Sequence, residues 1–567
     1  MKIRHIHIQN FRGIRELSWA PDEYLNCLIG PGDTCKTSML DAIEVGLAAR
    51  YQAVFDDTDF YDLNPDNPIS ITITIGDLPT TFIADGMYGL HTRGWDATNK
   101  QLIDEPDENL NLEYVISTQL KVDRTLEPQW QLYTERDTEK ERSLQFQHRQ
   151  MLAPTRLGPY IERHLSWGRQ SILTRLTQDK DQSKDILADA ARIARQHFTQ
   201  SGQKLFNDLV SKVQEYAGRV GVRLHPDISA RLDVKGVSVN TGGISLHHGE
   251  LPLRVLGAGS ARLMVAALQH QAGLSAPFAI IDEVEHGLEP HRIARLLKYL
   301  KDTPTQQVFL TTHSPVVLEE LAVADVLVVR RASDGRVTVH RASGGSKDVD
   351  PQRIIRTDPN AYLAPAILVC EGKTEVGIAR GLDQHWTSAG KQPFATAGVV
   401  PTSGGGIDEA PKVARYFRDL AYNVALFLDS DVNPSDNEVL AELSQLGVKV
   451  MRWAEGEATE DVLFQDLRPN ELRQLLEAIK EEVPGLLDQL RQHAGKIVHD
   501  WNDLLEGCGE PELRKQLAVT AKKCEWIKKR LTLSERIGRE ILGPHSADLK
   551  SKNQTAIREL RVWIDAT

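Results

Sequence analysis

The chain has 567 residues, of which 41% are hydrophobic and 26% are charged, and its formal net charge is −12. The length exceeds what one hydrophobic core usually supports, so we expect two or three domains, and the composition is ordinary for a globular protein. The acidic balance argues against a protein that coats nucleic acid nonspecifically. It remains compatible with a local site in which metal ions meet phosphates.

The five cysteines form no Cys-x-x-Cys pair. Their spacing argues against a zinc module or a disulfide framework and favours a reducing cytoplasm. Residues 1–14 alternate polar and apolar side chains as a strand does, without an apolar signal core. The sequence contains no apolar run long enough to span a bilayer. We therefore expect a cytoplasmic protein that does not enter a membrane.

Strand patterns open the chain at residues 2–8, 17–19 and 24–29. The third strand runs directly into the loop GPGDTCKTS, residues 30–38, and residues 39–51 then show the spacing of a helix. A strand, a glycine-containing loop with a lysine and hydroxyl groups, and a helix form the context of a phosphate-binding loop. The backbone N–H groups of the loop and the positive end of the helix would hold the phosphates.

The side chains of this loop have distinct expected roles. Lys36 would reach the β and γ phosphates of a nucleotide, and Thr37 would bind Mg²⁺ through its hydroxyl. Cys35 stands where such loops usually have glycine, so its side chain would crowd the phosphates or change the local dihedral angles, and hydrolysis would be slow or lost. The other loop residues expected at the phosphates are Gly30, Gly32 and Ser38.

The pattern changes in the middle of the chain. Residues 69–75 and 112–120 predict strands, whereas residues 141–220 are charged and helical in pattern. The run at 185–219 is expected to project as an arm or to pack as a lid, with its charges on a solvated face. Residues 222–253 return to short strands with glycine turns.

A second phosphate-facing segment follows. The stretch LGAGSARLM, residues 256–264, places small residues and a serine at the start of a helix. Gly259 and Ser260 would face phosphate there, because the N-terminus of a helix favours anions.

Two acids and a histidine close the next two strands. Residues 277–315 have the pattern strand, helix, strand; the first strand ends at Asp282 and Glu283, and the second ends at His313. In one parallel sheet both strand ends meet at the same edge, where ligands bind. Asp282 would hold Mg²⁺ through water, Glu283 would activate a water molecule and His313 would lie near the terminal phosphate. The alternative is a surface loop with charged ends.

Residues 343–365 are polar and contain several prolines, which predicts a linker. Beyond them a second parallel sheet is expected, with strands at 366–370, 424–428 and 448–453 and a glycine turn within 399–407. Each of these strands is followed by acids, which would gather at the carboxyl edge of the sheet. The acids are Glu371, Glu375, Asp429, Asp431 and Glu460.

A cluster of like charges is costly unless divalent cations lie within it, and hard carboxylate ligands favour Mg²⁺ or Mn²⁺. Two such ions can hold the attacking and leaving oxygens of a phosphodiester in line. The alternative is that these acids stand at solvent-exposed strand ends.

The order of motifs resembles a known pairing of domains. IQNFRGI, GPGDTCKTS, LGAGSARLM, IIDEVEHGLEP and TTHSP resemble the opening strand, Walker A, signature segment, Walker B with D-loop, and switch histidine of an ABC-type ATPase head of the SMC/RecF kind. EGKTE, the glycine turn, DSD and ATEDV resemble a Toprim domain. An ABC-type head followed by a Toprim domain resembles the OLD-family (overcoming lysogenization defect) nucleases.

The resemblance implies an α/β fold with two domains. Residues 1–360 would form the ABC-type ATPase domain, with a helical insertion at about 125–245 that the resemblance covers poorly. Residues 361–567 would form the Toprim nuclease domain, a parallel sheet flanked by helices, with a helical C-terminal segment.

The resemblance also implies a DNA endonuclease that nicks or cuts both strands with Mg²⁺ or Mn²⁺ and that binds ATP to regulate assembly or activity. Arg12 would contact ATP, and Gly259 and Ser260 would close on ATP held by another protomer. A homodimer or higher homo-oligomer is therefore implied. Such enzymes are often linked to defence against phage, beside a reverse transcriptase or a helicase as partner.

Within the Toprim part, the five acids would hold the nuclease metals, with Glu371 and Asp429 in catalysis. Family nucleases use a late lysine, for which Lys528 is the first choice and Lys550 the second. The chain departs from the family pattern at Cys35 and at Val284, where proline is usual after the two acids.

Two other functions remain open. The first is a clamp or repair ATPase of the SMC/RecF kind that binds DNA without cutting it, and the intact set of carboxylates argues against it. The second uses the Toprim part as a topoisomerase or primase, but a domain that would supply a nucleophilic tyrosine is not evident in the sequence.

Overall fold

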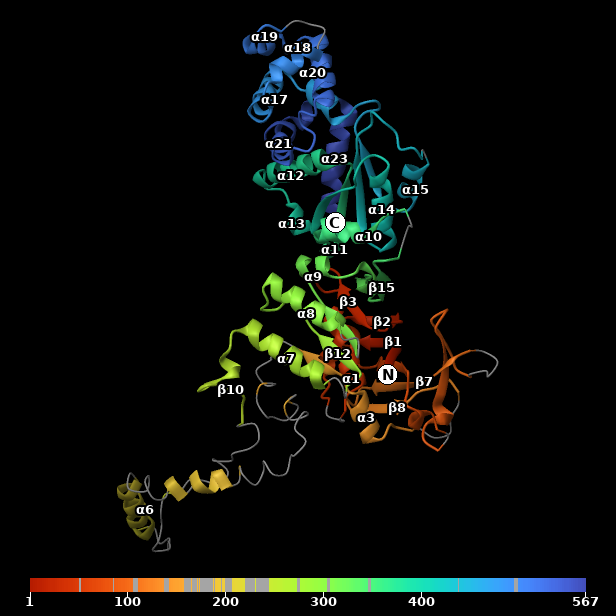
Figure 1. Ribbon diagram of the computed structural model, residues 1–567, viewed down its shortest axis with the longest axis vertical. Helices are drawn as coiled ribbons and strands as arrows, with labels where there is room; N and C mark the ends of the chain where they lie inside the picture. The colour runs from red at the N-terminus through yellow and green to blue at the C-terminus, as the bar shows by residue number, and fades with distance from the viewer. Residues whose placement is uncertain are drawn as a thin grey trace.

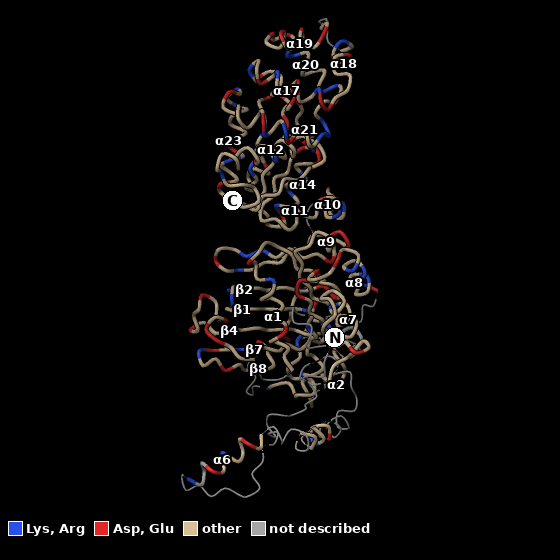
Figure 2. Tube along the Cα trace, turned by 90° about the vertical axis from the view of Figure 1, so that its left-hand side faces the viewer, with Lys and Arg blue, Asp and Glu red and all other residues tan. Residues whose placement is uncertain are grey.

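The computed structural model describes twelve main segments of the chain. They are residues 1–49, 53–84, 86–105, 111–136, 142–157, 206–219, 244–272, 276–302, 306–344, 348–436, 438–493 and 498–567. The structure also describes residues 165, 171, 173, 187, 189–194, 196–198 and 230. Figure 1 shows helix α6 at one end of the long axis, the N-terminal sheets in the middle and helices α17–α20 at the other end. The side view keeps this order and shows acidic and basic residues interspersed over both domains (Figure 2).

The first sheet of the N-terminal domain is antiparallel. Its strand order is β2-β1-β4-β7-β5-β6, and β8 pairs with β7. The alternation of apolar and polar residues in β1 and β4 buries isoleucines such as Ile6, Ile8 and Ile71. The bounds are β1 Lys2–Phe11, β2 Ile14–Trp19, β4 Ile69–Gly76, β5 Thr92–Asp96, β6 Gln101–Ile103, β7 Glu113–Val122 and β8 Pro128–Leu132.

The second sheet carries the expected nucleotide residues. Its order is β15-β14-β3-β13-β12-β9, and only β15 is antiparallel to its neighbour. Because β3, β12 and β13 are parallel, the loops that follow them leave the same edge of the sheet. The bounds are β3 Leu25–Ile29, β9 Thr155–Leu157, β12 Phe278–Ile281, β13 Gln307–Thr311, β14 Val326–Arg331 and β15 Val337–Arg341.

Helices fill both sides of this second sheet. Helix α1, Lys36–Gly46, lies between the two sheets, where Leu40 and Ile43 share a core with Ile71 of β4 and Phe309 of β13. Helices α7, α8 and α9 pack on the opposite face and share a second core with β3 and β13. The bounds are α7 Ala258–Ala272, α8 Pro290–Asp302 and α9 Pro315–Glu320, and two short helices near the first sheet are α2 Thr80–Ile83 and α3 Phe146–Leu152.

The C-terminal domain is built on a parallel sheet of order β17-β16-β18-β19. Alternate residues of β16 face two cores: Leu368 packs in the core that includes α12, and Ile367 and Val369 pack in the core that includes α14. The predicted second parallel sheet is therefore present. The strands are β16 Ala366–Cys370, β17 Val399–Ser403, β18 Asn423–Leu428 and β19 Lys449–Arg452.

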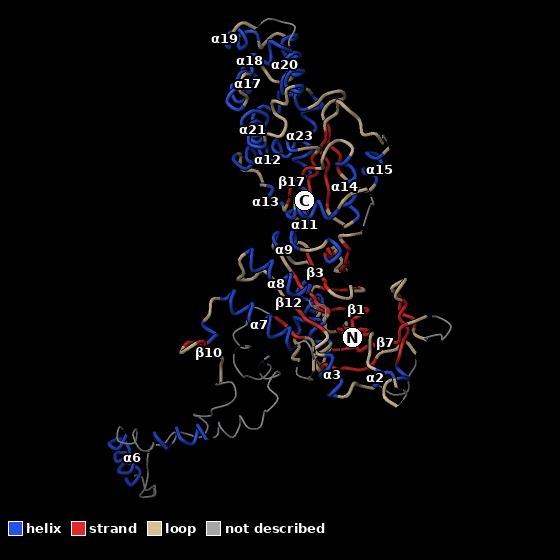
Figure 3. Tube along the Cα trace, viewed as in Figure 1, coloured by secondary structure: helices blue, strands red, loops and turns tan. Residues whose placement is uncertain are grey.

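Helices surround this sheet and extend beyond it, as the secondary-structure view makes plain (Figure 3). Those that pack near the sheet are α12 Lys373–Ser388, α13 Phe394–Ala397, α14 Glu409–Asp419, α15 Val439–Gln445, α16 Thr459–Gln465 and α23 Ser551–Ala566. The remaining helices are α17 Pro469–Glu482, α18 Leu486–His493, α19 Trp501–Gly507, α20 Pro511–Lys523, α21 Leu531–Ile537 and α22 Gly543–His545.

The prediction of an irregular linker at 343–365 is wrong, because the segment contains two helices. They are α10, Pro351–Thr357, and α11, Pro359–Leu363, and each begins with a proline at its first position. Proline suits the first position of a helix because the N–H group that it lacks would have no partner within the helix there. These prolines therefore start helices instead of breaking them. Tyr362 is fully buried and packs in the core shared by the two domains.

The predicted helical insertion lies largely outside the described residues. At its expected start near residue 125 the chain still belongs to the domain body, because β8 pairs with β7 and β9 pairs with β12. Further along, helix α6, Asn207–Arg219, stands apart from the body (Figure 1), followed by β10 His247–His248 and β11 Leu251–Pro252. A search of the described helices found none with the length and apolar character needed to cross a membrane.

Candidate functional site

The loop between β3 and α1 holds Lys36 folded back on its own backbone. The Nζ atom of Lys36 donates to the carbonyl oxygens of Gly30 at 2.9 Å and Pro31 at 2.7 Å. Burial of the side chain lowers the pKa of Lys36 to about 8, because the charged form loses solvation. A phosphate in the loop would replace these neutral acceptors with an anionic one, to which hydrogen bonds are stronger.

Glycine is required at the start of this loop. The φ angle of Gly30 is +150°, and a Cβ atom at this position would lie 2.5 Å from the carbonyl oxygen of Val329 on β14. Gly32, in contrast, is exposed and has open space around it. Thr37 is exposed and Ser38 is half-buried in the first turn of α1. The loop thus connects β3 to α1 as the sequence predicted, and its role as a phosphate cradle stays a prediction.

Cys35 adopts a left-handed backbone conformation, with φ +70° and ψ +18°. For a residue with a Cβ atom this conformation costs about 1 kcal/mol or more, which explains why glycine is usual here. A Cβ atom on Gly13 would meet the Cys35 Sγ atom at 2.7 Å, so the thiol lies against the turn between β1 and β2. Burial raises the pKa of the Cys35 thiol, so the neutral form is favoured.

The expected hydrolysis residues converge beside this loop. The Oδ1 atom of Asp282 accepts a hydrogen bond of 2.7 Å from the Thr311 hydroxyl, which in turn accepts one of 2.9 Å from the backbone N–H of Glu283. Burial lowers the pKa of His313, and the charge of Lys36 lowers it further. Asp282, Glu283, His313 and Lys36 are therefore close enough to act on one another.

Glu285 is a site residue that the sequence analysis missed. Its carboxylate accepts hydrogen bonds from the Thr312 hydroxyl at 2.8 Å and from the backbone N–H of His313 at 2.7 Å. These contacts tie the loop after β13 to the loop after β12. The only signal in the sequence is that a third acid follows Asp282 and Glu283 in the same turn.

Arginines tie this edge together. Arg156, at β9, bonds Asp282 at 3.3 Å and Glu44 at 2.6 Å, and it also pairs with Asp41. Arg12, which was expected to contact ATP, pairs with Asp41 as well. A nucleotide contact would have to share the Arg12 guanidinium with this acid. Arg156 was not predicted, because β9 has only three residues and no clear pattern.

The segment with Gly259 and Ser260 begins α7 and packs against the turn before α8. A Cβ atom on Gly259 would lie 2.5 Å from the carbonyl oxygen of Gly287, so glycine is needed for this close approach. The hydroxyl of Ser260 accepts a hydrogen bond of 3.1 Å from the guanidinium of Arg292 on α8. Within the chain, these residues contact α8 and its preceding turn.

The predicted acids of the C-terminal domain lie at the carboxyl edge of its sheet. The backbone N–H of Asp429 donates to the Glu371 carboxylate at 3.2 Å, which connects the ends of β18 and β16. Thr459, at the start of α16, donates its hydroxyl to Asp429 at 2.8 Å and lies 3.4 Å from Glu375. The Glu375 carboxylate also accepts a hydrogen bond of 2.8 Å from the backbone N–H of Gly372. Thr459 is a second residue that sequence reasoning missed.

Burial and mutual repulsion disfavour the ionised forms of these acids. The pKa of Glu375 rises to about 7, first through burial and then through the Glu371 charge. The pKa of Asp429 is raised by burial and by Glu375, and that of Glu460 is raised mainly by burial. In the described part of the chain, Glu371, Glu375, Asp429 and Glu460 form no ion pair with lysine or arginine. Hard oxygen donors without a cation are a donor set that fits Mg²⁺ or Mn²⁺.

A lysine that the sequence analysis did not select lies at this cluster. The Nζ atom of Lys522, on α20, is 2.5 Å from Asp461 and 3.3 Å from Asp431. Lys528 is exposed and lies 4.0 Å from Glu525, although its charge still reaches Glu371. Lys550 pairs with Glu457 and Asp466 at the start of α23, away from the predicted acids.

The carboxylates are near neighbours but are not yet arranged as ligands of one ion. Among the described residues, no three His, Cys, Asp or Glu side chains are close enough to hold a metal together. The Thr459 hydroxyl donates a hydrogen bond to the Asp429 carboxylate, and Lys522 forms an ion pair with Asp431. Rotation of these side chains would be needed before they could share a cation.

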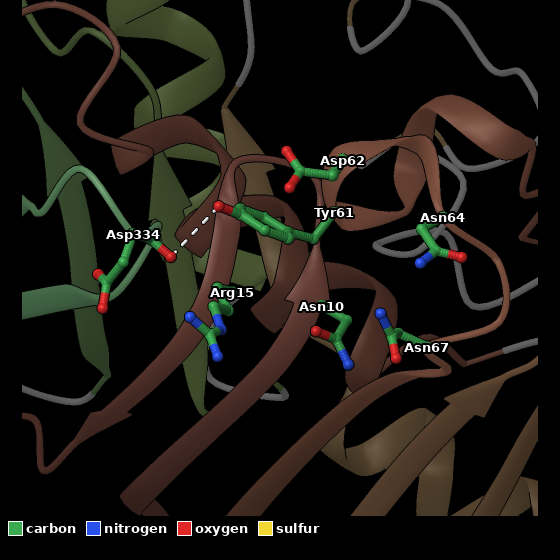
Figure 4. Close-up of a pocket in the computed structure, with 7 residues that line it drawn as sticks. All are labelled: Asn10, Arg15, Tyr61, Asp62, Asn64, Asn67 and Asp334. Atoms are coloured by element: carbon green, nitrogen blue, oxygen red, sulfur yellow. Dashed lines mark hydrogen bonds between the residues drawn. The ribbon is translucent and has the colours of Figure 1, made fainter.

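A polar pocket of about 350 Å³ lies elsewhere on the N-terminal domain (Figure 4). One of its walls is the hydroxyl of Tyr61, which donates to the carbonyl oxygen of Asp334 at 3.2 Å. None of the residues predicted for either site lines it. The lining residues are Asn10, Arg15, Tyr61, Asp62, Asn64, Asn67 and Asp334.

Family comparisons identify the N-terminal part as an ATPase domain. Residues 1–152 match the family described as "AAA ATPase domain", and residues 156–319 match the family described as "AAA domain, putative AbiEii toxin, Type IV TA system". The predicted nucleotide-binding part of the chain therefore matches AAA-type ATPase domains, which implies that it binds ATP. Both matches end before the C-terminal sheet. No curated protein matches the chain.

Solved structures with similarity to the chain include SMC head domains. A head bound to the C-terminal winged-helix domain of ScpA is 12% identical, with a TM-score of 0.33, over 60% of this chain and 98% of that one. The Thermotoga maritima head is 15% identical, with a TM-score of 0.30, over 60% and 99%. A Pyrococcus furiosus head with an extended coiled coil, bound to the C-terminal domain of ScpA, is 13% identical, with a TM-score of 0.36, over 60% and 96%.

Proposed function

We propose that this chain is an ATP-binding, metal-dependent DNA endonuclease of the OLD kind, in which the ATPase domain regulates cleavage by the C-terminal domain. The observation that carries the proposal is a group of acids at the carboxyl edge of a parallel sheet: Glu375 and Glu460 are buried and Asp429 is half-buried, and none has an ion-pair partner in the described residues. Buried unpaired carboxylates are costly, and a bound divalent cation removes that cost.

The acids have complementary roles in this proposal. Glu371, Glu375, Asp429, Asp431 and Glu460 would hold Mg²⁺ or Mn²⁺, which when bound polarises the phosphodiester and activates water. Burial raises the pKa of Glu371, so its carboxylate is suited to accept a proton from the attacking water. Lys522 lies beside the cluster and would offer its charge to the DNA phosphate once it leaves Asp431.

In the ATPase domain, Lys36 and the loop N–H groups would bind the phosphates of ATP, while Thr37 and Asp282 would hold Mg²⁺. Glu283 would activate water, and His313, held by Glu285, would face the terminal phosphate.

Gly259 and Ser260 would complete the site on another protomer, so the active form is a homodimer or larger homo-oligomer. The toxin named in the family that matches residues 156–319 supports a role in defence against phage.

The test is cleavage of supercoiled plasmid by the purified chain with Mg²⁺ or Mn²⁺, with and without ATP. Wild-type protein is expected to produce nicked or linear DNA, and the Asp429→Asn variant is expected to lose this activity. Glu512→Gln serves as a matched control, because Glu512 is an exposed acid on α20 outside the cluster. Equal cleavage by wild type and Asp429→Asn would exclude the carboxylate site.

A second candidate function is a DNA-binding clamp without nuclease activity. One contact favours it: Lys522 neutralises Asp431 and Asp461, as a structural ion pair would. If the protein is a clamp, the wild type and the Asp429→Ala variant should bind DNA with equal affinity, and neither should cut it.

A further inference from the structure

Arg262 is a buried charge that neither site has yet explained. It lies one turn into α7, and its side chain is fully buried. Its Nη2 atom donates to the backbone carbonyl oxygens of Asp282 at 2.6 Å and Glu283 at 2.7 Å. One guanidinium nitrogen thus holds two successive peptide groups of the loop that carries the expected hydrolysis residues.

Stability does not account for this arginine. The Nε and Nη1 atoms of Arg262 are buried and have no hydrogen-bond partner among the described residues. A buried cation with two unused N–H groups pays a desolvation penalty that its remaining contacts do not fully offset. An apolar side chain of similar volume would fill the same space without that penalty. A residue that opposes stability in this way is expected to serve the reaction instead.

The loop needs such a restraint at Glu283. This residue has φ +47°, a left-handed conformation that residues other than glycine rarely adopt. On its N-terminal side, the Glu283 N–H donates to the Thr311 hydroxyl. On its C-terminal side, the N–H of the next peptide group, from Val284, donates to the Thr311 carbonyl oxygen at 3.1 Å. Arg262 holds the carbonyl oxygen of this same peptide group, and it also holds that of the preceding one, from Asp282. The Glu283 side chain is 59% exposed, so packing does little to direct it, and the backbone sets the Cα–Cβ direction from which its carboxylate extends.

We propose that Arg262 is a positioning residue for ATP hydrolysis, which fixes the left-handed backbone of Glu283 and thereby aims its carboxylate at the nucleotide. Arg262 also joins the helix that carries Gly259 and Ser260 to the same loop, so a displacement of α7 would move the Glu283 peptide directly. The inference concerns ATP turnover alone and does not depend on whether the C-terminal domain cuts DNA.

The test compares Arg262→Met with wild type in three measurements: ATP affinity, steady-state ATP hydrolysis and thermal unfolding. Removing the restraint is expected to lower kcat by about 100-fold, the scale of a misplaced general base, while KM and the Kd for ATP change by less than about twofold. The unfolding temperature should stay equal or rise, because the variant removes an unsatisfied buried cation. Arg295→Met, an exposed arginine on α8, is the matched control and should leave all three values unchanged.

Two further variants make the result decisive. Arg262→Lys keeps one donor group that can reach the two carbonyl oxygens, so it should recover at least about tenfold of the lost kcat. In the Arg262→Met/Glu283→Gln double variant the two losses should not add, because both act on the same carboxylate.

A parallel loss of affinity, turnover and unfolding temperature in both Arg262 variants would show a structural role and overturn the proposal. An unchanged kcat, additive losses in the double variant, or a wild type without ATP turnover would overturn it as well.

Discussion

The guanidinium of Arg330 lies over the ring of Tyr422, with the central guanidinium carbon 3.6 Å from the ring centroid. Arg330 belongs to β14 and follows Val329, whose carbonyl oxygen faces Gly30 of the nucleotide loop. Tyr422 immediately precedes β18, the strand that Asp429 follows. A single contact between two side chains therefore joins the strand beside the nucleotide loop to the strand that carries the central acid of the second site.

Removal of this contact should uncouple the two domains. In Arg330→Met the cation–π attraction is lost, and for a desolvated pair this is worth about 2 kcal/mol. We expect the ratio of DNA cleavage with ATP to cleavage without ATP to approach one, while each domain keeps its own ligand affinity. Plasmid cleavage at several ATP concentrations measures the ratio, and ATP titration checks the affinity.

The exposed Arg353, on α10 near the same interface, supplies the control as Arg353→Met. An ATP response in Arg330→Met that equals the wild-type response would show that coupling runs through other contacts.

The sequence predicted the strands and acids of both sites because each depends on a local pattern. The strand, loop and helix around Lys36 and the acids at strand ends need only neighbours in the chain to be recognised. Lys522 lies 91 residues from its partner Asp431, and no periodicity or spacing specifies such a pair. The pairing of Arg330 with Tyr422 was missed for the same reason.

The stability of the metal-free protein should depend on pH through Glu375. Its pKa is about 7 in the folded chain, raised from an ordinary value of 4.5. The folded state therefore binds a proton that the unfolded state has released between these two values, so stability is highest below pH about 4.5 and falls as pH rises through 7. Thermal unfolding between pH 5 and 8 should show this fall in wild type and a weaker one in Glu375→Gln.

Divalent cations should reverse this trend. Metal binding requires ionised carboxylates, so Mn²⁺ should raise the unfolding temperature more at pH 8 than at pH 6. Glu512→Gln should behave as wild type in both series. A wild-type curve that is flat over this range, with or without Mn²⁺, would contradict the burial of an acid that titrates near neutral pH.

The late lysine of the C-terminal site is expected to be Lys522. Lys522→Met should lower plasmid cleavage by more than about tenfold, because the only lysine contact to Asp431 and Asp461 in the described residues is lost. Lys528→Met should have a smaller effect, since Lys528 is exposed and acts on Glu371 only at a distance. Lys515→Met, an exposed lysine on α20, is the control. A larger loss in Lys528→Met than in Lys522→Met would return the role to the residue first chosen from the sequence.

Lys550 differs from both of these lysines. Its pairs with Glu457 and Asp466 fasten the start of α23. Lys550→Met should therefore lower the unfolding temperature, while the cleavage rate of the folded fraction stays near that of wild type.

Cys35 offers a direct test of how the nucleotide loop limits turnover. Its φ of +70° suits glycine, so Cys35→Gly removes strain of about 1 kcal/mol, whereas Cys35→Ala keeps that strain and loses the thiol contact with Gly13. We expect Cys35→Gly to be at least as stable as wild type and to hydrolyse ATP faster, and Cys35→Ala to be less stable than Cys35→Gly by about 1 kcal/mol. Chemical unfolding and steady-state ATPase assays measure the two effects.

The direction of the thiol decides how large the gain in turnover can be. Because Sγ lies against the turn between β1 and β2, the side chain restrains the backbone of the loop more than it blocks the phosphates. Cys35→Gly should therefore increase kcat while changing the Kd for ATP by less than about threefold. If the variant instead bound ATP much more tightly at the same kcat, the thiol would act by crowding the phosphates. In that case the thiol would leave its position against Gly13 when ATP binds.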